Sequence, residues 1–282
     1  MSPKNYLALQ SLQNFAREFS AYTGEYVIIG GAACHLWFAD KQIHFRNTLD
    51  VDMALLLQAN ALPFVQAFLN FVDRGGYRAE SHALRDGRVK RRLYRFLLEK
   101  EREYPAMIEL LGPDNAAIQH AFDQRSIPVK VEGEYCGLSC MLLDPAYYDM
   151  LRNGTTECLG VPVVNRETLI ALKIKAFLNI QTLHRQPVVP PHGSDASMDN
   201  ARKHRKDVIS LLYLSELSVT PVAPSIHRDI EAFATQLIRD SAERDSLIRS
   251  VGSTQSLGHI PMDSSLLTEM MQDLLALFPA QG

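Results

Sequence analysis

The sequence predicts an α+β protein, with a mixed sheet in residues 1–164 followed by an all-helical region in residues 165–282. In the first part, short apolar runs alternate with glycine breaks and helical patterns, which is typical of strands interleaved with helices. After Val164 the short runs end, and longer stretches with a helical apolar period follow. We therefore place a domain boundary near residue 164.

The elements of the first region follow from apolar spacing and from the glycines between the runs. Residues 5–23 carry apolar side chains at helical spacing, and Gly24 can end that helix. The other expected elements, in chain order, are a strand at 26–29, a helix at 32–38, a strand within 49–57, a helix at 61–73, a strand pair at 88–99 and 104–111, and a hairpin at 127–132 and 135–143 about Gly133.

The second region is expected to contain only helices. Asn165 is a suitable N-cap for a helix at 166–182, because its side chain can accept a hydrogen bond from a backbone N–H of the first turn. Residues 186–198, rich in Pro, Gly, Ser and His, predict a mobile loop. Further helices are expected at 199–217, 224–250 and 264–278.

Composition indicates a globular protein without a membrane span. No apolar run approaches the roughly 20 residues that cross a bilayer, and the start of the chain lacks the apolar core of a signal peptide. We therefore expect a cytoplasmic location. The four cysteines, Cys34, Cys136, Cys140 and Cys158, do not match a metal-knuckle spacing, and we expect reduced, mostly buried thiols.

Positive and negative charges nearly balance in the whole chain, but basic residues are concentrated in one segment. The formal net charge of −3 excludes a globally basic nucleic-acid binder. A local basic run fits either a solvated edge strand or a phosphate-binding patch. Its residues are Arg85, Arg88, Lys90, Arg91, Arg92 and Arg95.

Two carboxylates interrupt the apolar strand within 49–57. Side chains alternate between the faces of a strand, so Asp50 and Asp52 share one face, roughly 6.6 Å apart along the strand. Leu49, Val51, Met53 and Leu55 then line the buried face. Two like charges in this position are costly unless a cation or water accompanies them, so the pair predicts a functional site.

Two charged residues of the helical region fall on apolar faces. Winding residues 166–182 at 100° per residue places Lys173 among the apolar side chains and Lys175 on the opposite face, in solvent. Asp207 precedes a helix that is apolar nearly all round, and we expect it to pair with Lys173. The alternatives are a lysine whose amine reaches water and an aspartate that stabilises a helix N-terminus.

This series of motifs resembles the nucleotidyltransferase superfamily with a polymerase-beta-like palm. Gly30-Gly31 at a helix start is followed by Asp50-Val-Asp52, by Leu169-Ile-Ala-Leu-Lys173-Ile-Lys-Ala176 and by Lys206-Asp207-Val-Ile-Ser-Leu-Leu. The last two segments are similar to motifs of the AbiEii/MenT-type nucleotidyltransferases, which are toxins of type IV toxin–antitoxin and phage-abortive systems. The resemblance spans residues 26 to about 217, and the last 65 or so residues match no motif.

The resemblance implies a palm domain at 1–164, a helical domain at 165–282 and a role for each matched residue. Its catalytic residues would be Asp50, Asp52, Lys173 and Asp207; its nucleotide-binding residues would be Gly30, Gly31, Arg46 and Lys173. Asp50 and Asp52 would bind Mg²⁺, with Glu109 either a third ligand or a core-edge residue without a catalytic part. Other members of the superfamily often have Gly-Ser where this chain has Gly30-Gly31, so a phosphate-contacting hydroxyl is absent from that motif.

The implied activity is transfer of nucleotides from an NTP to RNA, at the tRNA acceptor end, with Mg²⁺ as cofactor. A winged-helix antitoxin is the partner that the resemblance implies. Two alternatives stay open: the acceptor is a hydroxyl of a protein or of a small molecule such as an aminoglycoside, or the palm binds nucleotides without catalysis. The near-neutral charge favours another acceptor over RNA, and the presence of both aspartates argues against a non-catalytic palm.

Overall fold

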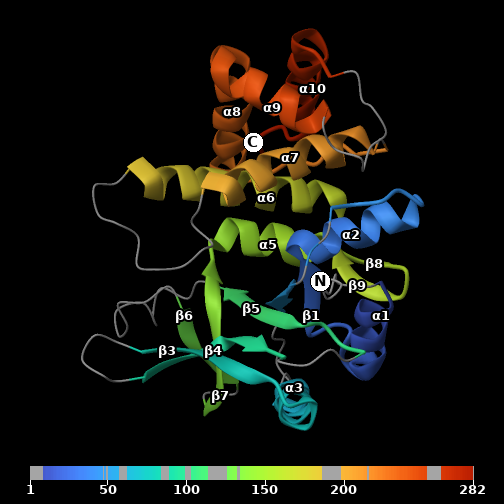
Figure 1. Cartoon of the computed structure of the whole chain (residues 1–282), viewed down its shortest axis with the longest axis vertical. Helices are drawn as coiled ribbons and strands as arrows, with labels where there is room; N and C mark the ends of the chain where they lie inside the picture. The colour runs from blue at the N-terminus through green and yellow to red at the C-terminus, as the bar shows by residue number, and fades with distance from the viewer. Residues whose placement is uncertain are drawn as a thin grey trace, which may run out of the picture. The chain divides into compact units, whose positions relative to one another are not determined.

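The computed structural model describes residues 9–46, 48, 50–56, 62–83, 89–98, 103–113, 126–131, 134–185, 198–214, 216–252 and 262–281. The chain divides into two compact units (Figure 1). The first unit is 1–40 with 46–164, and the second is 41–45 with 165–282. In these residues no helix combines the length and apolar character needed to cross a membrane.

One mixed sheet forms the centre of the first unit. Its order is β3-β4-β5-β2-β1-β9-β8, with β7 also paired to β5 and β6 paired to β7, which makes nine strands in the described residues. β2 runs antiparallel to β1 and parallel to β5. The strands are β1 (Tyr26–Ile29), β2 (Asp50–Leu55), β3 (Arg78–Ala83), β4 (Val89–Leu97), β5 (Met107–Pro113), β6 (Ser126–Val131), β7 (Glu134–Leu143), β8 (Thr155–Cys158) and β9 (Val161–Val164).

Four α-helices accompany this sheet in the described residues, namely α1 (Leu9–Glu18), α2 (Gly30–Asp40), α3 (Leu62–Gly75) and α5 (Pro145–Asn153). α1 and α3 join through an aromatic cluster around Tyr26 of β1. Phe15 of α1 and Phe19, which directly follows α1, both contact Phe71 of α3. Phe64 of α3 stacks on the Tyr26 ring at a centroid distance of 5.7 Å. This cluster fixes β1, whose last residue precedes the Gly30-Gly31 turn.

Tyr26 brings a hydroxyl into this aromatic cluster. The hydroxyl is buried and has no hydrogen-bond partner among the described residues, and burial raises the pKa of Tyr26 well above its usual value. We expect Tyr26→Phe to leave the free energy of unfolding unchanged or to raise it by about 1 kcal/mol, because the variant removes an unsatisfied buried hydroxyl. Urea unfolding of both proteins measures this difference. A loss above about 1 kcal/mol would show that the hydroxyl has a partner.

The second unit is helical throughout its described residues, apart from an isolated bridge between Val222 and Ala280. Its helices are α6 (Arg166–Arg185), α7 (Met198–Tyr213), α8 (Pro224–Arg239), α9 (Ser241–Gly252) and α10 (Ser264–Leu277). α6 packs along α7. Asn165 caps α6 as predicted, because its Oδ1 accepts a hydrogen bond from Thr168 N at 2.9 Å.

The α+β prediction is confirmed, and most elements lie where the sequence placed them. The β4–β5 pair is antiparallel, and so is the hairpin of β6 and β7. One expected helix is wrong: residues 224–250 form two helices, because the chain turns at Asp240, whose side chain accepts a hydrogen bond from Glu243 N at the start of α9. Sequence reasoning also missed β3, α5, β8 and β9.

Candidate active site

The turn at Gly30 and Gly31 connects β1 directly to α2. Gly30 has φ of +67°, a left-handed conformation that side chains disfavour. A Cβ added at Gly30 would lie 1.8 Å from Oδ2 of Asp52. Two features therefore require glycine at position 30: its backbone conformation, and the space that the Asp52 carboxylate occupies. The carboxylate lies against the start of α2, where the first backbone N–H groups lack partners within the helix.

Asp50 and Asp52 project from one face of β2, as the alternation predicted. Both side chains are half-buried, whereas Val51 and Met53 on the opposite face are fully buried. Asp52 pairs in register with Ile29, the residue before the glycine turn. The pairing of β1 with β2 therefore places Asp52 beside the glycine turn.

Glu109 and Arg95 continue the row of residues that begins at Asp52. Glu109 is the register partner of Asp52 on parallel β5, and Arg95 is the register partner of Glu109 on antiparallel β4. Register partners on adjacent strands share a face, so the three side chains project the same way. The Arg95 and Glu109 side chains form an ion pair, and each is only 9% exposed.

The ion pair with Arg95 favours the structural alternative for Glu109 over a metal-binding role. Within the described ranges, no group of three or more His, Cys, Asp or Glu side chains is arranged to hold a metal ion. Mg²⁺ is commonly bound through one or two carboxylates, with water and phosphate oxygens completing an octahedron. Asp50 and Asp52 supply two carboxylates on one strand face, and Gly30 leaves room for the second. These residues fit Mg²⁺ without Glu109.

Thr48 joins this group, although sequence reasoning did not select it. Its Oγ1 donates a hydrogen bond to Oδ1 of Asp50 at 2.7 Å. A Cβ added at Gly31 would lie 2.7 Å from the same Oγ1 and 3.8 Å from Nη2 of Arg46. Arg46, selected as a phosphate contact, is therefore near the glycine turn. The available signal was a hydroxyl residue two positions before Asp50.

Lys173 and Asp207 form an ion pair in the second unit. Lys173 Nζ lies 2.7 Å from Asp207 Oδ2, and the two side chains are 4% and 2% exposed. The pairing inferred from their positions on apolar helix faces is confirmed. Lys175 is not free in solvent as expected: its Nζ lies 2.8 Å from Oδ2 of Asp229, and its side chain is 30% exposed.

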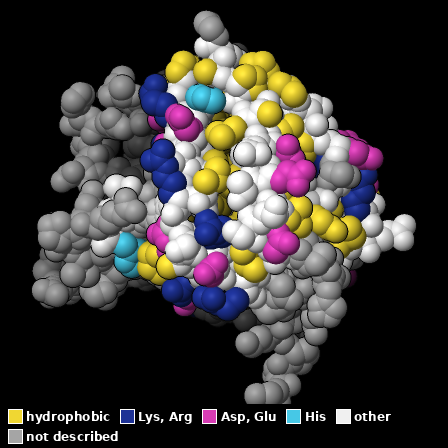
Figure 2. All heavy atoms as spheres, turned by 90° about the horizontal axis from the view of Figure 1, so that it is seen from above, with side chains coloured by type: hydrophobic (Ala, Val, Ile, Leu, Met, Phe, Trp, Pro, Cys, Tyr) yellow, Lys and Arg dark blue, Asp and Glu magenta, His cyan; other side chains and the backbone are white. Residues whose placement is uncertain are grey.

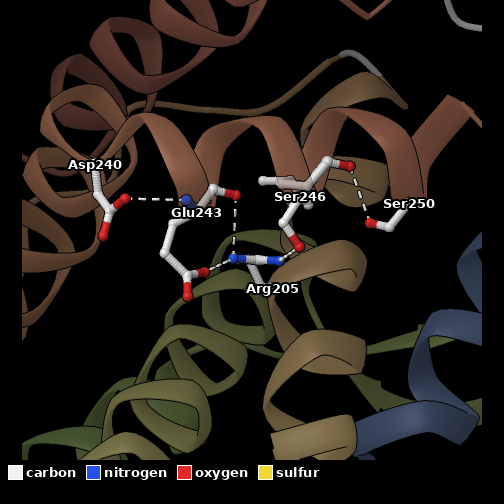
Figure 3. A network of polar contacts seen from close by, with 6 residues as sticks. Arg205, Asp240, Glu243, Ser246 and Ser250 are labelled. Atoms are coloured by element: carbon white, nitrogen blue, oxygen red, sulfur yellow. Dashed lines mark hydrogen bonds and ion pairs between the residues drawn. The ribbon is translucent and has the colours of Figure 1, made fainter.

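Arg205 is buried although it belongs to a basic stretch of the sequence. Lys203, Arg205 and Lys206 all lie within α7, and Arg205 is 2% exposed. Figure 3 shows its guanidinium held by the first turns of α9, through the Glu243 carboxylate and carbonyl and the Ser246 hydroxyl. Burial and the positive charge of nearby Arg202 lower the pKa of Arg205, and the negative charge of Asp240 raises it in part. The resulting pKa is about 10. Arg205 therefore supports α7–α9 packing and is not available to bind phosphates.

Some expected features lie outside the described residues. They are Leu49, residues 186–197 of the expected loop at 186–198, and the side chains of the basic run other than Arg95. Met198, the last residue of that expected loop, starts α7. Cys34 and Cys158 are buried and form no disulfide, as predicted, while the side chains of the other two cysteines are also outside the described set.

Comparison with known proteins gives similarity to solved structures only. No family model matches the chain, and no curated protein matches it. An antigenic nucleotidyltransferase-like protein from Paracoccidioides brasiliensis shares 15% identity over 87% of this chain and 95% of that one, with a TM-score of 0.44.

Two Helicobacter pylori structures are also similar. A candidate nucleotidyltransferase shares 12% identity over 96% of this chain and 95% of that one, with a TM-score of 0.32. The protein JHP933 shares 13% identity over 96% and 92%, also with a TM-score of 0.32. All three TM-scores are below 0.5, so the function proposed next is drawn from this chain's own residues.

Proposed function

We propose that this protein is a Mg²⁺-dependent nucleotidyltransferase whose metal-binding residues are Asp50 and Asp52. One observation carries the proposal: β2 presents both carboxylates on one face, and Asp52 lies against the glycine turn that starts α2. A helix N-terminus following glycines suits phosphate groups, because its N–H groups and its dipole favour negative charge. Carboxylates beside such a turn suit a metal-bound triphosphate.

Each residue then has a defined task in the transfer. Gly30 and Gly31 make room for the Asp52 and Thr48 side chains at the start of α2, whose N–H groups would bind the triphosphate, and Arg46 adds a positive charge near the turn. Bound Mg²⁺ would lower the pKa of an attacking hydroxyl and stabilise negative charge on the phosphates. Asp50 and Asp52 hold and orient that cation. On the basis of the sequence motifs, we also propose that Lys173 contacts the nucleotide phosphates and that Asp207, its ion-pair partner, orients Lys173.

We propose RNA, at the acceptor end of tRNA, as the acceptor, and a toxin of a type IV toxin–antitoxin or abortive-infection system as the biological role. Support for this choice comes from the sequence motifs and from the basic run at 85–95, apart from Arg95, which is buried in its pair with Glu109. A winged-helix antitoxin would be the neutralising partner, and the cytoplasm would be the location. Expression in a bacterial host should stop growth only when the transfer site is intact.

A protein or small-molecule hydroxyl is the second candidate acceptor, and it is favoured by the surface charge. On the face shown in Figure 2, Lys and Arg side chains are interspersed with Asp and Glu. Arg205 is withdrawn from the surface by its pairing with Glu243. RNA binding depends on many phosphate contacts, whereas a small acceptor requires few.

A labelling experiment tests the activity and separates the acceptors. The protein is incubated with each α-labelled NTP, Mg²⁺ and either total RNA, total protein or a small-molecule acceptor such as an aminoglycoside, and is compared with Asp52→Asn. We expect label on RNA from the wild type and at least about 100-fold less from the variant, because the metal loses a ligand. Asp149→Asn, which removes an exposed carboxylate of α5, is the matched control and should label normally.

Each outcome of this experiment selects one reading of the site. Label on protein or on a small acceptor would replace RNA while keeping the nucleotidyltransferase assignment. No label with any NTP or acceptor would overturn that assignment and leave a palm that binds nucleotides without catalysis. Equal labelling by wild type and Asp52→Asn would show that the carboxylate pair is not the transfer site.

A further inference from the structure

We propose that Thr48 is a positioning residue that fixes the Asp50 carboxylate for cation binding, and that Gly31 makes the space in which Thr48 does so. This inference rests on the proposed function, because it assigns a task within the same site. Thr48 touches neither nucleotide nor acceptor in this proposal. It acts through Asp50.

The first observation is the hydrogen bond between the two side chains. Thr48 Oγ1 donates to Asp50 Oδ1 at 2.7 Å, and Thr48 is only 6% exposed, so water competes little for this contact. A carboxylate with one oxygen held in this way cannot rotate freely about its Cβ–Cγ bond. Oδ2 of Asp50 is then kept in one orientation, which is the condition for a pre-formed metal ligand.

The second observation is the steric relation between Thr48 and the glycine turn. A Cβ at position 31 would lie 2.7 Å from Thr48 Oγ1 and 3.3 Å from Thr48 Cβ. A side chain at 31 would therefore displace the hydroxyl that holds Asp50. The two glycines have different partners: Gly30 makes room for Asp52, and Gly31 makes room for Thr48.

A buried threonine with a purely structural role is the competing explanation, and two variants separate the explanations. Thr48→Val keeps the shape and removes the donor, whereas Thr48→Ser keeps the donor and removes the methyl group. If Thr48 only fills space, the valine variant is the milder change, because the serine variant leaves a cavity. If it orients Asp50, the serine variant is the milder change.

The test is Mn²⁺ binding to the full-length protein without nucleotide, measured by electron paramagnetic resonance, alongside thermal unfolding. Loss of a hydrogen bond to a metal ligand typically weakens metal binding about 10–100-fold, and we expect that loss in Thr48→Val. Thr48→Ser should bind Mn²⁺ close to wild-type affinity. Equal Mn²⁺ affinity of Thr48→Val and wild type, or a weaker affinity in Thr48→Ser than in Thr48→Val, would overturn the proposal.

A double-mutant cycle tests the role of Gly31. Gly31→Ala should weaken Mn²⁺ binding strongly in the wild type but little in Thr48→Ala, because the displaced hydroxyl is already gone. Additive effects would contradict a shared space. Wild-type protein that binds Mn²⁺ no better than Asp50→Asn would overturn this inference together with the proposed metal site, whereas loss confined to the Thr48 variants leaves the proposed function intact.

Discussion

Gly30→Ala is expected to lower nucleotide transfer by about 100-fold or more while leaving a folded protein. The new methyl group would lie 1.8 Å from Asp52 Oδ2, so the carboxylate must move by more than an ångström. A displacement of about 1 Å at a reacting centre can cost about 100-fold in rate. The φ of +67° adds backbone strain of roughly 1–2 kcal/mol for any L side chain.

Gly160→Ala separates strain from the collision with Asp52. Gly160 has φ of +78° in the turn between β8 and β9, and an added Cβ there meets no atom within 4 Å. It should lose roughly 1–2 kcal/mol of unfolding free energy in urea and keep normal transfer. Gly30→Ala with wild-type transfer kinetics, or with a loss no larger than that of Gly160→Ala, would show that Asp52 is not a catalytic ligand at this turn.

The parts of the site that were predictable are those fixed by local periodicity. Alternation along β2 placed Asp50 and Asp52 on one face, and the apolar run before Gly30 placed a strand directly before a helix. The position of Lys173 on an apolar helix face similarly required a buried anion. Each of these inferences depends only on residues a few positions apart. Over that range the period of a strand or helix determines the direction in which each side chain points.

The features that were missed depend on partners distant in the sequence. The partner of Glu109 was one of them. Arg95 reaches Glu109 because β4 and β5 pair in one register, and the sequence around Glu109 does not show which cation would pair with it. Arg205 is buried by α9, whose Glu243 lies 38 positions later. The basic residues Lys203 and Lys206 on either side suggest that Arg205 is exposed as well. The packing of α7 against α9 instead buries Arg205.

The short elements β8, β9 and α5 were not predicted, because their local sequence signals are weak or were not recognised. β8 and β9 have four residues each and join through Leu159 and Gly160, both with positive φ. A proline in β9 also weakened its strand pattern, because proline cannot donate to the strand ladder. α5 begins at Pro145 after an Asp144 N-cap, a start signal that directly follows the predicted hairpin and was not recognised.

Removing one partner of the Lys173–Asp207 pair is expected to be the most destabilising single change in the second unit. Both side chains are almost fully buried and lie 2.7 Å apart. A buried charge left without its partner typically costs 3–5 kcal/mol. Lys173→Met and Asp207→Val should each lower the free energy of unfolding by about that amount and abolish transfer. Lys175→Ala should cost only about 0–1 kcal/mol and retain activity, because its pair with Asp229 is partly exposed.

The double variant Lys173→Met/Asp207→Val distinguishes a stabilising pair from a functional one. Replacing both charges with apolar groups removes the unpaired charge, so stability should return to within about 1 kcal/mol of the wild type. Transfer should remain absent, because the phosphate contact assigned to Lys173 is lost. A stable double variant with normal transfer would reduce the pair to a helix-packing contact. A stable, inactive one requires a chemical role, because folding can no longer explain the loss.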